Sequence, residues 1–306
     1  ILDGGGGSDT LIGGKGDDTY IVDGLEDVIS ETLSNASSGG VDTVKAGITF
    51  SIAALANIDN LTLTGSAISG TGNSLNNVMR GNALTNFLDG GLGADTLKGG
   101  AGVDVYFLDN AGDVVDEEGN TDLGDEVRTS FALASGIAGV EKYTYLGSAA
   151  WIFTGTGADE TITGGTGNDT LDGGEGHDLM FGGADEDMLY GGAGNDRMYG
   201  EEGNDRLNGD AGNDSLYGGV GNDVFLINAS PGHEMIYGGA GSSWTDTIDL
   251  SGFAGQGGGW TLTLDGGHAI TSQSAHDILL DQDASGHIDF ADGSSVTFQG
   301  IEKIHF

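Results

Sequence analysis

The sequence contains no cysteine, a single proline and few positive charges, with nine lysine and arginine residues among 306. The absence of cysteine excludes disulfides, thiolate metal sites and cysteine nucleophiles. No hydrophobic run approaches the roughly 20 residues that a membrane-spanning helix requires. The 48 aspartates and glutamates give a formal net charge of −39. So acidic a chain repels itself when compact, and we expect it to bind neither nucleic acid nor an anionic membrane surface.

Glycine is the abundant residue, with 61 copies. A collagen helix is excluded, because the glycines follow no three-residue period and proline is almost absent. High charge alone favours disorder. However, 37% of the residues are hydrophobic, and they recur at a fixed spacing. We therefore predict a folded chain whose stability depends on bound cations.

Residues 155–226 divide into eight consecutive blocks of nine residues. Each block begins with glycine and usually has glycine at the second and fourth positions, followed by an acid at the sixth and an apolar residue at the eighth. Because glycine enters positive φ without steric cost, the first six residues predict a turn. The last three predict a very short strand with one inward side chain. The sixth-position acids, which we predict to be metal ligands, are Glu160, Asp169, Asp178, Asp187, Asp196, Asp205, Asp214 and Asp223.

One three-residue strand cannot bury itself, so the blocks must stack. Two blocks per coil, with parallel strands about 4.8 Å apart, give an all-β, two-sided solenoid with a thin apolar core. Blocks n and n+2 then share an edge, where their carboxylates form a column that a cation must neutralise. Carboxylate and carbonyl oxygens in an adaptable cage are the ligands of Ca²⁺. The pattern predicts six such cages, from the 160/178 pair to the 205/223 pair.

The block sequence GGxGxDxUx, in which U is apolar, resembles the RTX (repeats-in-toxin) calcium-binding nonapeptide family. The resemblance implies a right-handed parallel β-roll with several bound Ca²⁺ ions. It also implies a secreted protein that leaves through a type I secretion channel, using an uncleaved C-terminal signal. No N-terminal signal peptide is apparent, and Ile1-Leu2-Asp3 fits the tail of a preceding nonapeptide. We therefore expect a fragment of a longer protein.

Six further residues in two other runs occupy the acid position. The predicted ligands there are Asp9, Asp18, Asn77, Asn86, Asp95 and Asp104. Because asparagine offers only a neutral oxygen, the 77/95 and 86/104 cages should be weaker than paired acids. Within the main run, Asp185 replaces the fourth glycine, and Glu201 and Asp210 replace the second. These side chains either strain their turns or supply another oxygen.

The segments between the runs are related to each other. DDTYIVDGLEDVISE (17–31) parallels VDVYFLDNAGDVVDE (103–117). NLTLTG and KYTYLG alternate apolar and polar residues, as half-buried strands do. We predict β-coils without calcium here, with a short helix around Ile52–Ala56 as an alternative for that stretch. The resulting division is nonapeptides at 1–21, 72–107 and 155–226, spacers at 22–71 and 108–154, and a C-terminal β cap at 227–306.

The cap is predicted from strand-like segments after the period breaks. WTLTL, DILL, HIDF and SVTFQGIEKIHF suggest antiparallel strands joined by GG and DGS turns. A nonapeptide start at 238 is stretched by an insertion before Asp246. Asp281–Asp292 matches an EF-hand loop except at its last position, but its flanks predict strands. We interpret it as a hairpin turn, with an isolated calcium loop as the alternative.

No catalytic residue is predicted. His233-Glu234 lacks the second histidine of a zinc motif, because Tyr237 stands at that place. The sequence has neither a G-x-S-x-G elbow nor a phosphate-binding loop. Close carboxylates are explained by the repeat, so they indicate no acid–base pair.

Two functions remain from these observations. The first is a non-catalytic, calcium-binding structural or adhesive element at a bacterial cell surface, such as a surface layer, an adhesin or a matrix protein. Its partners would be calcium, the type I secretion machinery, and either further copies of itself or a surface glycan. The second is the export and folding module of a secreted hydrolase whose catalytic domain lies upstream of Ile1. The upstream sequence distinguishes them.

Overall fold

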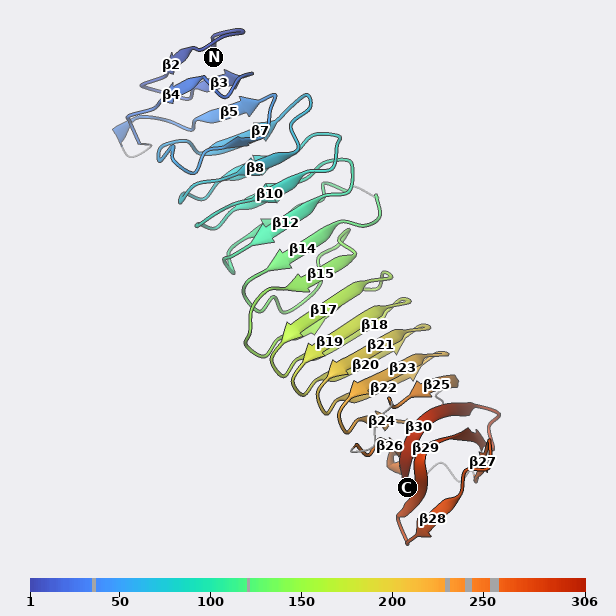
Figure 1. Cartoon of the computed structure of the whole chain (residues 1–306). Helices are drawn as coiled ribbons and strands as arrows, with labels where there is room; N and C mark the ends of the chain where they lie inside the picture. The colour runs from blue at the N-terminus through green and yellow to red at the C-terminus, as the bar shows by residue number, and fades with distance from the viewer. Residues whose placement is uncertain (35–36, 120–121, 229–231, 240–243, 254–258) are drawn as a thin grey trace. The chain divides into compact units, whose positions relative to one another are not determined.

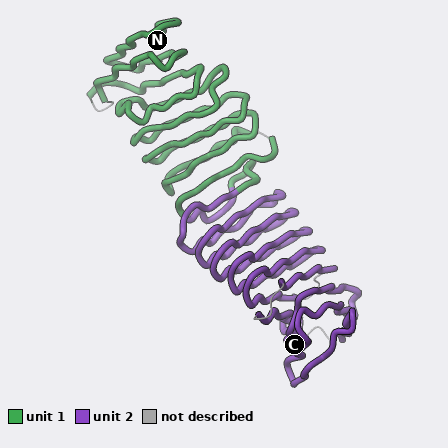
Figure 2. The backbone as a smooth tube through the Cα atoms, in the orientation of Figure 1, with its two compact units in different colours: residues 1–131, 137–142 green, residues 132–136, 143–306 purple. Residues whose placement is uncertain are grey.

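The computed structural model describes residues 1–34, 37–119, 122–228, 232–239, 244–253 and 259–306. The described chain is all-β, and parallel strands stack as a β-solenoid with a small C-terminal sheet, which confirms the predicted fold class. It divides into two compact units (Figure 2). Unit 1 comprises 1–131 and 137–142, and unit 2 comprises 132–136 and 143–306. Among the described residues, no helix has the length and apolar character needed to span a membrane.

In unit 1, successive strands go alternately to different sheets. One parallel sheet is ordered β1 (Leu2–Asp3), β3 (Thr19–Val22), β5 (Thr43–Ala46), β7 (Asn60–Leu63), β9 (Val78–Arg80), β11 (Thr96–Lys98) and β13 (Val114–Val115). Opposite it run β6 (Phe50–Ser51), β8 (Ser69–Thr71), β10 (Phe87–Asp89), β12 (Val105–Leu108) and β14 (Glu126–Thr129), with β2 (Thr10–Ile12) paired to β4 (Val28–Ser30). The spacers therefore continue the solenoid that the nonapeptides begin.

The alternative helix around Ile52–Ala56 is wrong. The Leu55 N–H donates to the Ile52 carbonyl and the Ile58 N–H to the Leu55 carbonyl, so the segment forms two successive turns. Ile52 and Ile58 are both fully buried although six residues apart. A single helical turn is unstable by itself, whereas the two turns seat both side chains in the core.

The first seven nonapeptide blocks of unit 2 form strands of six residues rather than three, and the last block forms a strand of three. Pairing continues from the seventh position of one block to the third position of the next. From β16 to β22, each strand pairs in parallel with the second strand along, at an offset of 18 residues, as Met180 pairs with Met198. The strands are β16 (Ile152–Thr154), β17 (Thr161–Thr166), β18 (Thr170–Glu175), β19 (Leu179–Ala184), β20 (Met188–Ala193), β21 (Arg197–Glu202), β22 (Arg206–Ala211), β23 (Ser215–Val220) and β24 (Val224–Leu226). β15 (Lys142–Tyr145) pairs with β17.

The eighth-position side chains form the core of this solenoid, as predicted. All eight have an exposed fraction of 0%: Ile162, Leu171, Met180, Leu189, Met198, Leu207, Leu216 and Phe225. Burying each stabilises the fold by about 1.5–3 kcal/mol. Outside the core, the rings of Phe181, Tyr199, Tyr217 and Tyr237 stack along one sheet at centroid distances of 5.1, 4.7 and 4.7 Å.

The C-terminal strands close both sheets of unit 2 (Figure 1). They are β25 (His233–Tyr237), β26 (Thr247–Asp249), β27 (Trp260–Leu264), β28 (Ile270–Gln273), β29 (Asp277–Phe290) and β30 (Ser295–His305). β29 pairs antiparallel with β27, β28 and β30, as predicted. β30 also pairs parallel, first with β25 and then with β26. The part of β30 that pairs with β25 and the part that pairs with β26 meet at Gly300, which has a φ of 72°.

The hairpin-turn interpretation of Asp281–Asp292 is wrong. Most of that segment lies within the long strand β29, and the reversal to β30 follows Phe290. The strand is irregular between Leu279 and Ala284, and Asp283 there has a φ of 52°, so the calcium-loop alternative stays a prediction. The GG and DGS turns lie at the predicted places. Of the insertion before Asp246, residues 240–243 lie outside the described residues.

Candidate calcium sites

The sixth-position acids lie just before their strands, with their side chains turned into the solenoid. All eight in unit 2 are buried, with exposed fractions of 2% or less. From Asp178 to Asp223, each carboxylate accepts a backbone hydrogen bond from the acid 18 residues earlier, whereas Asp169 accepts one from Trp151 and Glu160 one from Thr156. For example, Glu160 N donates to Asp178 Oδ1 at 2.8 Å, and Asp178 N donates to Asp196 Oδ1 at 2.9 Å. The six predicted n/n+2 pairs are all brought together by this contact.

The other carboxylate oxygen of these aspartates, Oδ2, differs from Oδ1 in its hydrogen bonding. Oδ2 of each of the seven aspartates in the main run is buried and has no hydrogen-bond partner within the protein. An anionic oxygen removed from water without a partner is costly. The fold therefore presents a column of carboxylate oxygens that requires a ligand of positive charge.

The first-position glycines border these oxygens. A Cβ added to Gly164 would overlap Asp169 Oδ2 and come within 2.6 Å of the Gly182 carbonyl oxygen. The same relation recurs at Gly173 and Gly191. A charged and a neutral oxygen from different coils thus converge beside each glycine, in space that a side chain would fill. This is the donor set that Ca²⁺ prefers, so the residues present fit the ion.

Burial shifts the ionisation of these acids. It raises the pKa of Asp178, Asp187 and Asp223 to about 7, with neighbouring carboxylates adding to the shift. For Asp169 and Asp205 burial raises the pKa to about 6. Since the charged form is disfavoured without a cation, a bound cation and protonation compete for the same oxygens.

Comparison with known protein families identifies the repeats that carry these acids. The model of a family described as the RTX calcium-binding nonapeptide repeat (four copies) matches residues 1–29, 71–106, 80–115, 154–189 and 190–225. The chain carries RTX calcium-binding nonapeptide repeats in a parallel β-roll. It therefore binds several Ca²⁺ ions through these repeats. A comparison with curated proteins gives no match. The spacers at 30–70 and 116–153 and the cap lie outside the matched repeats.

In unit 1 the RTX positions are of two kinds. Asp95 and Asp104 are buried with an unpartnered Oδ2, like the main run. Asn77 and Asn86 donate a backbone N–H to these two aspartates, at 2.6 and 2.7 Å. Their own amides are occupied by the protein, because each Oδ1 accepts a backbone N–H and each Nδ2 donates to a carbonyl. The asparagines thus provide weaker support for an ion than paired acids.

At the N-terminal end, the two predicted ligands have partners from the spacer. Asp9 N donates to Asp27 Oδ1 at 3.2 Å, and Asp18 N donates to Asp42 Oδ1 at 2.8 Å. Asp9 Oδ2 is buried and unpartnered, as in the main run. The sequence analysis did not single out Asp27 or Asp42.

The series of acids linked by these backbone hydrogen bonds, which we call the acid ladder, continues outside the nonapeptides. Its members there are Asp113, Asp125, Glu141, Glu234, Asp246 and Glu302, each of which accepts the backbone N–H of an acid one coil earlier. In the cap, burial beside Asp214 raises the pKa of Glu234 to about 9. Asp113 and Asp246 directly precede a short β-branched segment, Val-Val and Thr-Ile, and this local signal could have identified these two.

The three departures from glycine occupy strained backbone. Asp185, Glu201 and Asp210 have φ values of 81°, 77° and 61°. Only glycine adopts this region without cost. Asp185 Oδ2 accepts the Gly167 N–H, and Asp210 Oδ1 accepts side-chain amides, so these carboxylates have protein partners.

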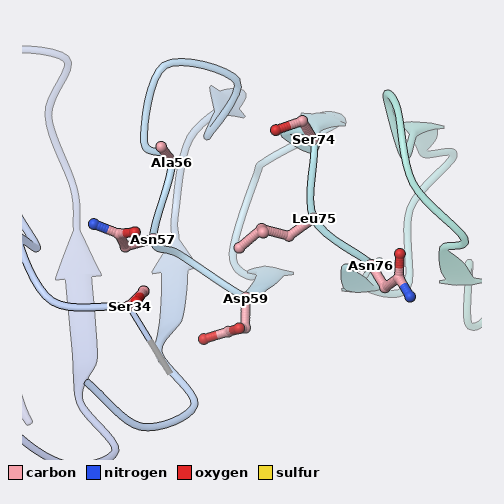
Figure 3. Close-up of a pocket in the computed structure, with 7 residues that line it drawn as sticks. All are labelled: Ser34, Ala56, Asn57, Asp59, Ser74, Leu75 and Asn76. Atoms are coloured by element: carbon pink, nitrogen blue, oxygen red, sulfur yellow. The ribbon is translucent and has the colours of Figure 1, made fainter. Parts of the chain in front are cut away.

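Unit 1 also contains a cavity of about 470 Å³ (Figure 3). It is lined by Ser34, Ala56, Asn57, Asp59, Ser74, Leu75 and Asn76. Among the described residues that line it, Asp59 is the one ionisable group, and its Oδ2 accepts the Asp42 N–H at 2.7 Å. Asp59 thus belongs to the acid ladder, and the cavity lining supplies no acid–base pair for catalysis.

Proposed function

We propose that this chain is a non-catalytic structural or adhesive element of a secreted bacterial protein, which folds on Ca²⁺ after type I export. The column of buried, unpartnered carboxylate oxygens carries the proposal. At low cytosolic calcium these charges oppose compaction, so the chain stays extended enough to pass a secretion channel. Extracellular calcium near millimolar fills sites of about 10⁻⁴–10⁻³ M affinity.

The free energy of calcium binding is large enough to switch the chain between an unfolded and a folded state. At ten times its Kd an independent site adds about 1.4 kcal/mol to stability. Six sites, one for each hydrogen-bonded pair of the main run, would add about 8 kcal/mol. Globular domains have a total stability of about 5–15 kcal/mol. Calcium alone therefore suffices to decide whether the roll is folded.

The partners of such an element would be calcium, the secretion machinery, and either other copies of the chain or a surface glycan. The aromatic rings weigh against glycan stacking by the main sheet, because Phe181, Tyr199, Tyr217 and Tyr237 cover one another's faces. Trp151 is fully buried and stacks on Tyr145. We therefore favour other copies of the chain, rather than a surface glycan, as the partner.

A second candidate is the folding and export module of a secreted enzyme. One observation favours it: β30 pairs with both sheets of unit 2 and leaves neither open for a further parallel coil. A module that ends its own solenoid can follow an unrelated catalytic domain.

A calcium titration followed by circular dichroism tests the folding step. We expect a steep, cooperative gain of β-structure between about 0.1 and 1 mM Ca²⁺ and its loss in excess chelator. Folded structure that persists in chelator at neutral pH would contradict the proposal. Electron microscopy of the calcium-loaded protein then separates the two candidates, since sheets or fibres support the structural element and dispersed particles support the module.

A further inference from the structure

Three carboxylates meet in unit 1, of which Asp18 belongs to an RTX block and Glu31 and Asp42 lie in the first spacer. Asp18 precedes β3, Glu31 follows β4 and Asp42 precedes β5, and one oxygen of each lies within 4.8 Å of the others. Figure 1 shows β3 and β5 as successive strands of this unit. Asp42 has an exposed fraction of 0%, and its Oδ2 has no hydrogen-bond partner. A fully buried carboxylate with one unpartnered oxygen is therefore part of the cluster.

A phenol oxygen joins the carboxylates. The Tyr20 hydroxyl donates to Glu31 Oε2 at 2.6 Å. A Cβ added to Gly13 would overlap the Tyr20 hydroxyl and lie 2.6 Å from Asp18 Oδ2 and 2.8 Å from Glu31 Oε2. Oxygens from three side chains thus face the same small region beside a glycine.

The charge of this cluster is not balanced by the protein. No salt bridge found among the described residues includes Asp18, Glu31 or Asp42. Backbone N–H groups of Gly14 and Leu33 donate to Glu31, but they carry no net charge. Three like charges at this separation repel one another strongly when shielded from water. Hard oxygen donors with three negative charges match a divalent cation such as Ca²⁺.

Glu31 makes this arrangement different from an RTX turn. Counting from Asp27 as a sixth position, Glu31 stands at the first position, where the nonapeptide has glycine. In a regular turn the backbone carbonyl at that position faces the glycine of the previous coil. Here a carboxylate takes its place.

The second spacer repeats the same residues. Asp104, Tyr106, Glu117 and Asp125 correspond to the first set, although the residues between them differ. A Cβ added to Gly99 would overlap Asp104 Oδ2 and the Tyr106 hydroxyl. Asp104 and Asp125 are fully buried, and their Oδ2 atoms are unpartnered. The residue set therefore recurs in the second spacer, although among the described residues only Asp18, Glu31 and Asp42 bring three carboxylate oxygens within 4.8 Å of one another.

We propose that Asp18, Glu31 and Asp42, together with the Tyr20 hydroxyl, form a calcium site of a second kind, in a spacer without the nonapeptide sequence. The inference rests on the calcium-binding function, because Asp18 also belongs to an RTX block. It extends that function to Glu31 and Tyr20, which the repeat pattern does not include.

Equilibrium dialysis of the whole chain against radioactive Ca²⁺ tests the site. We expect Glu31→Gln to bind one ion fewer than the wild type. The matched control, Glu26→Gln, removes the same charge from an exposed position of the same coil and should bind as many ions as the wild type. Equal ion counts for Glu31→Gln and the wild type overturn this inference alone, whereas a wild type that binds no calcium overturns the proposed function.

Tyr20→Phe provides an independent measurement that keeps all three carboxylates. It should weaken one class of sites by about tenfold, as loss of a group that orients a metal ligand commonly does. Circular dichroism in saturating calcium checks that each variant is folded. If Glu31→Gln fails to fold, an unchanged affinity of Tyr20→Phe at every site still refutes the role of this cluster.

Discussion

Replacing Asp196 by asparagine should change stability in opposite directions with and without calcium. Asp196 Oδ1 accepts the Asp178 N–H, and the Asp196 N–H donates to Asp214, so this acid takes part in two cages. Asparagine keeps the shape and one oxygen acceptor but removes the charge. Asn77 and Asn86 already occupy the equivalent position with both amide atoms hydrogen-bonded.

Two weakened sites set the expected loss in calcium. At ten times Kd the two cages contribute about 3 kcal/mol together, so Asp196→Asn should lose up to about that amount. In chelator the sign reverses, because the variant no longer buries an unpartnered anionic oxygen. Satisfying such a group is worth about 1–3 kcal/mol.

Urea unfolding followed by circular dichroism measures both changes. The chelator arm includes a stabilising osmolyte so that both chains fold. Asp172→Asn is the matched control, since it removes one charge at an outward ninth position of the same run and should change neither arm by more than about 0.5 kcal/mol. If Asp196→Asn destabilises equally in calcium and in chelator, the acid has a structural role only and the reasoning is refuted.

Three further predictions concern the turns and pH. Gly191→Ala places a Cβ against Asp196 Oδ2 and should reduce calcium affinity at that turn at least tenfold, measured by calorimetry, whereas Gly6→Ala, which meets no atom within 4 Å, should not. Glu201→Gly relieves a φ of 77° and should raise the unfolding free energy in calcium by about 1 kcal/mol, whereas Glu202→Gly removes the same charge without that relief and should not. In chelator the chain should be more folded at pH 5 than at pH 8. Burial raises the folded-state pKa of Asp178 to about 7, so the stability gained by protonation is lost as pH rises through that value; equal folding at the two pH values would contradict this.

The fixed period made much of the roll predictable. A nine-residue repeat with one apolar position determines which side chain points inward, so Met180 and Met198 could be placed in the core and in register from spacing alone. The same period places Asp178 beside Asp196. Strand length was not predictable from the apolar pattern, because backbone pairing continues through glycines that carry no side-chain signal.

Contacts that depend on irregular chain paths could not be predicted from the sequence. Glu302 accepts the Asp246 N–H at 2.9 Å across 56 residues, and this requires the fold of the whole cap. Glu31 reaches Asp18 only because the first spacer replaces a turn glycine with an acid. The Asp281–Asp292 segment resembles an ion loop locally, but β29 pairs on both sides over residues 286–289, which holds that part of the segment extended.

Crystals grown in calcium, with diffraction collected to record anomalous scattering, test the central claim most directly. The account predicts six anomalous peaks in the main run, one for each hydrogen-bonded pair of acids, each beside a first-position glycine and between the carboxylate of one coil and the carbonyl of the next coil on that edge. Ordered turns without any such peak, at calcium concentrations that support folding, would contradict it.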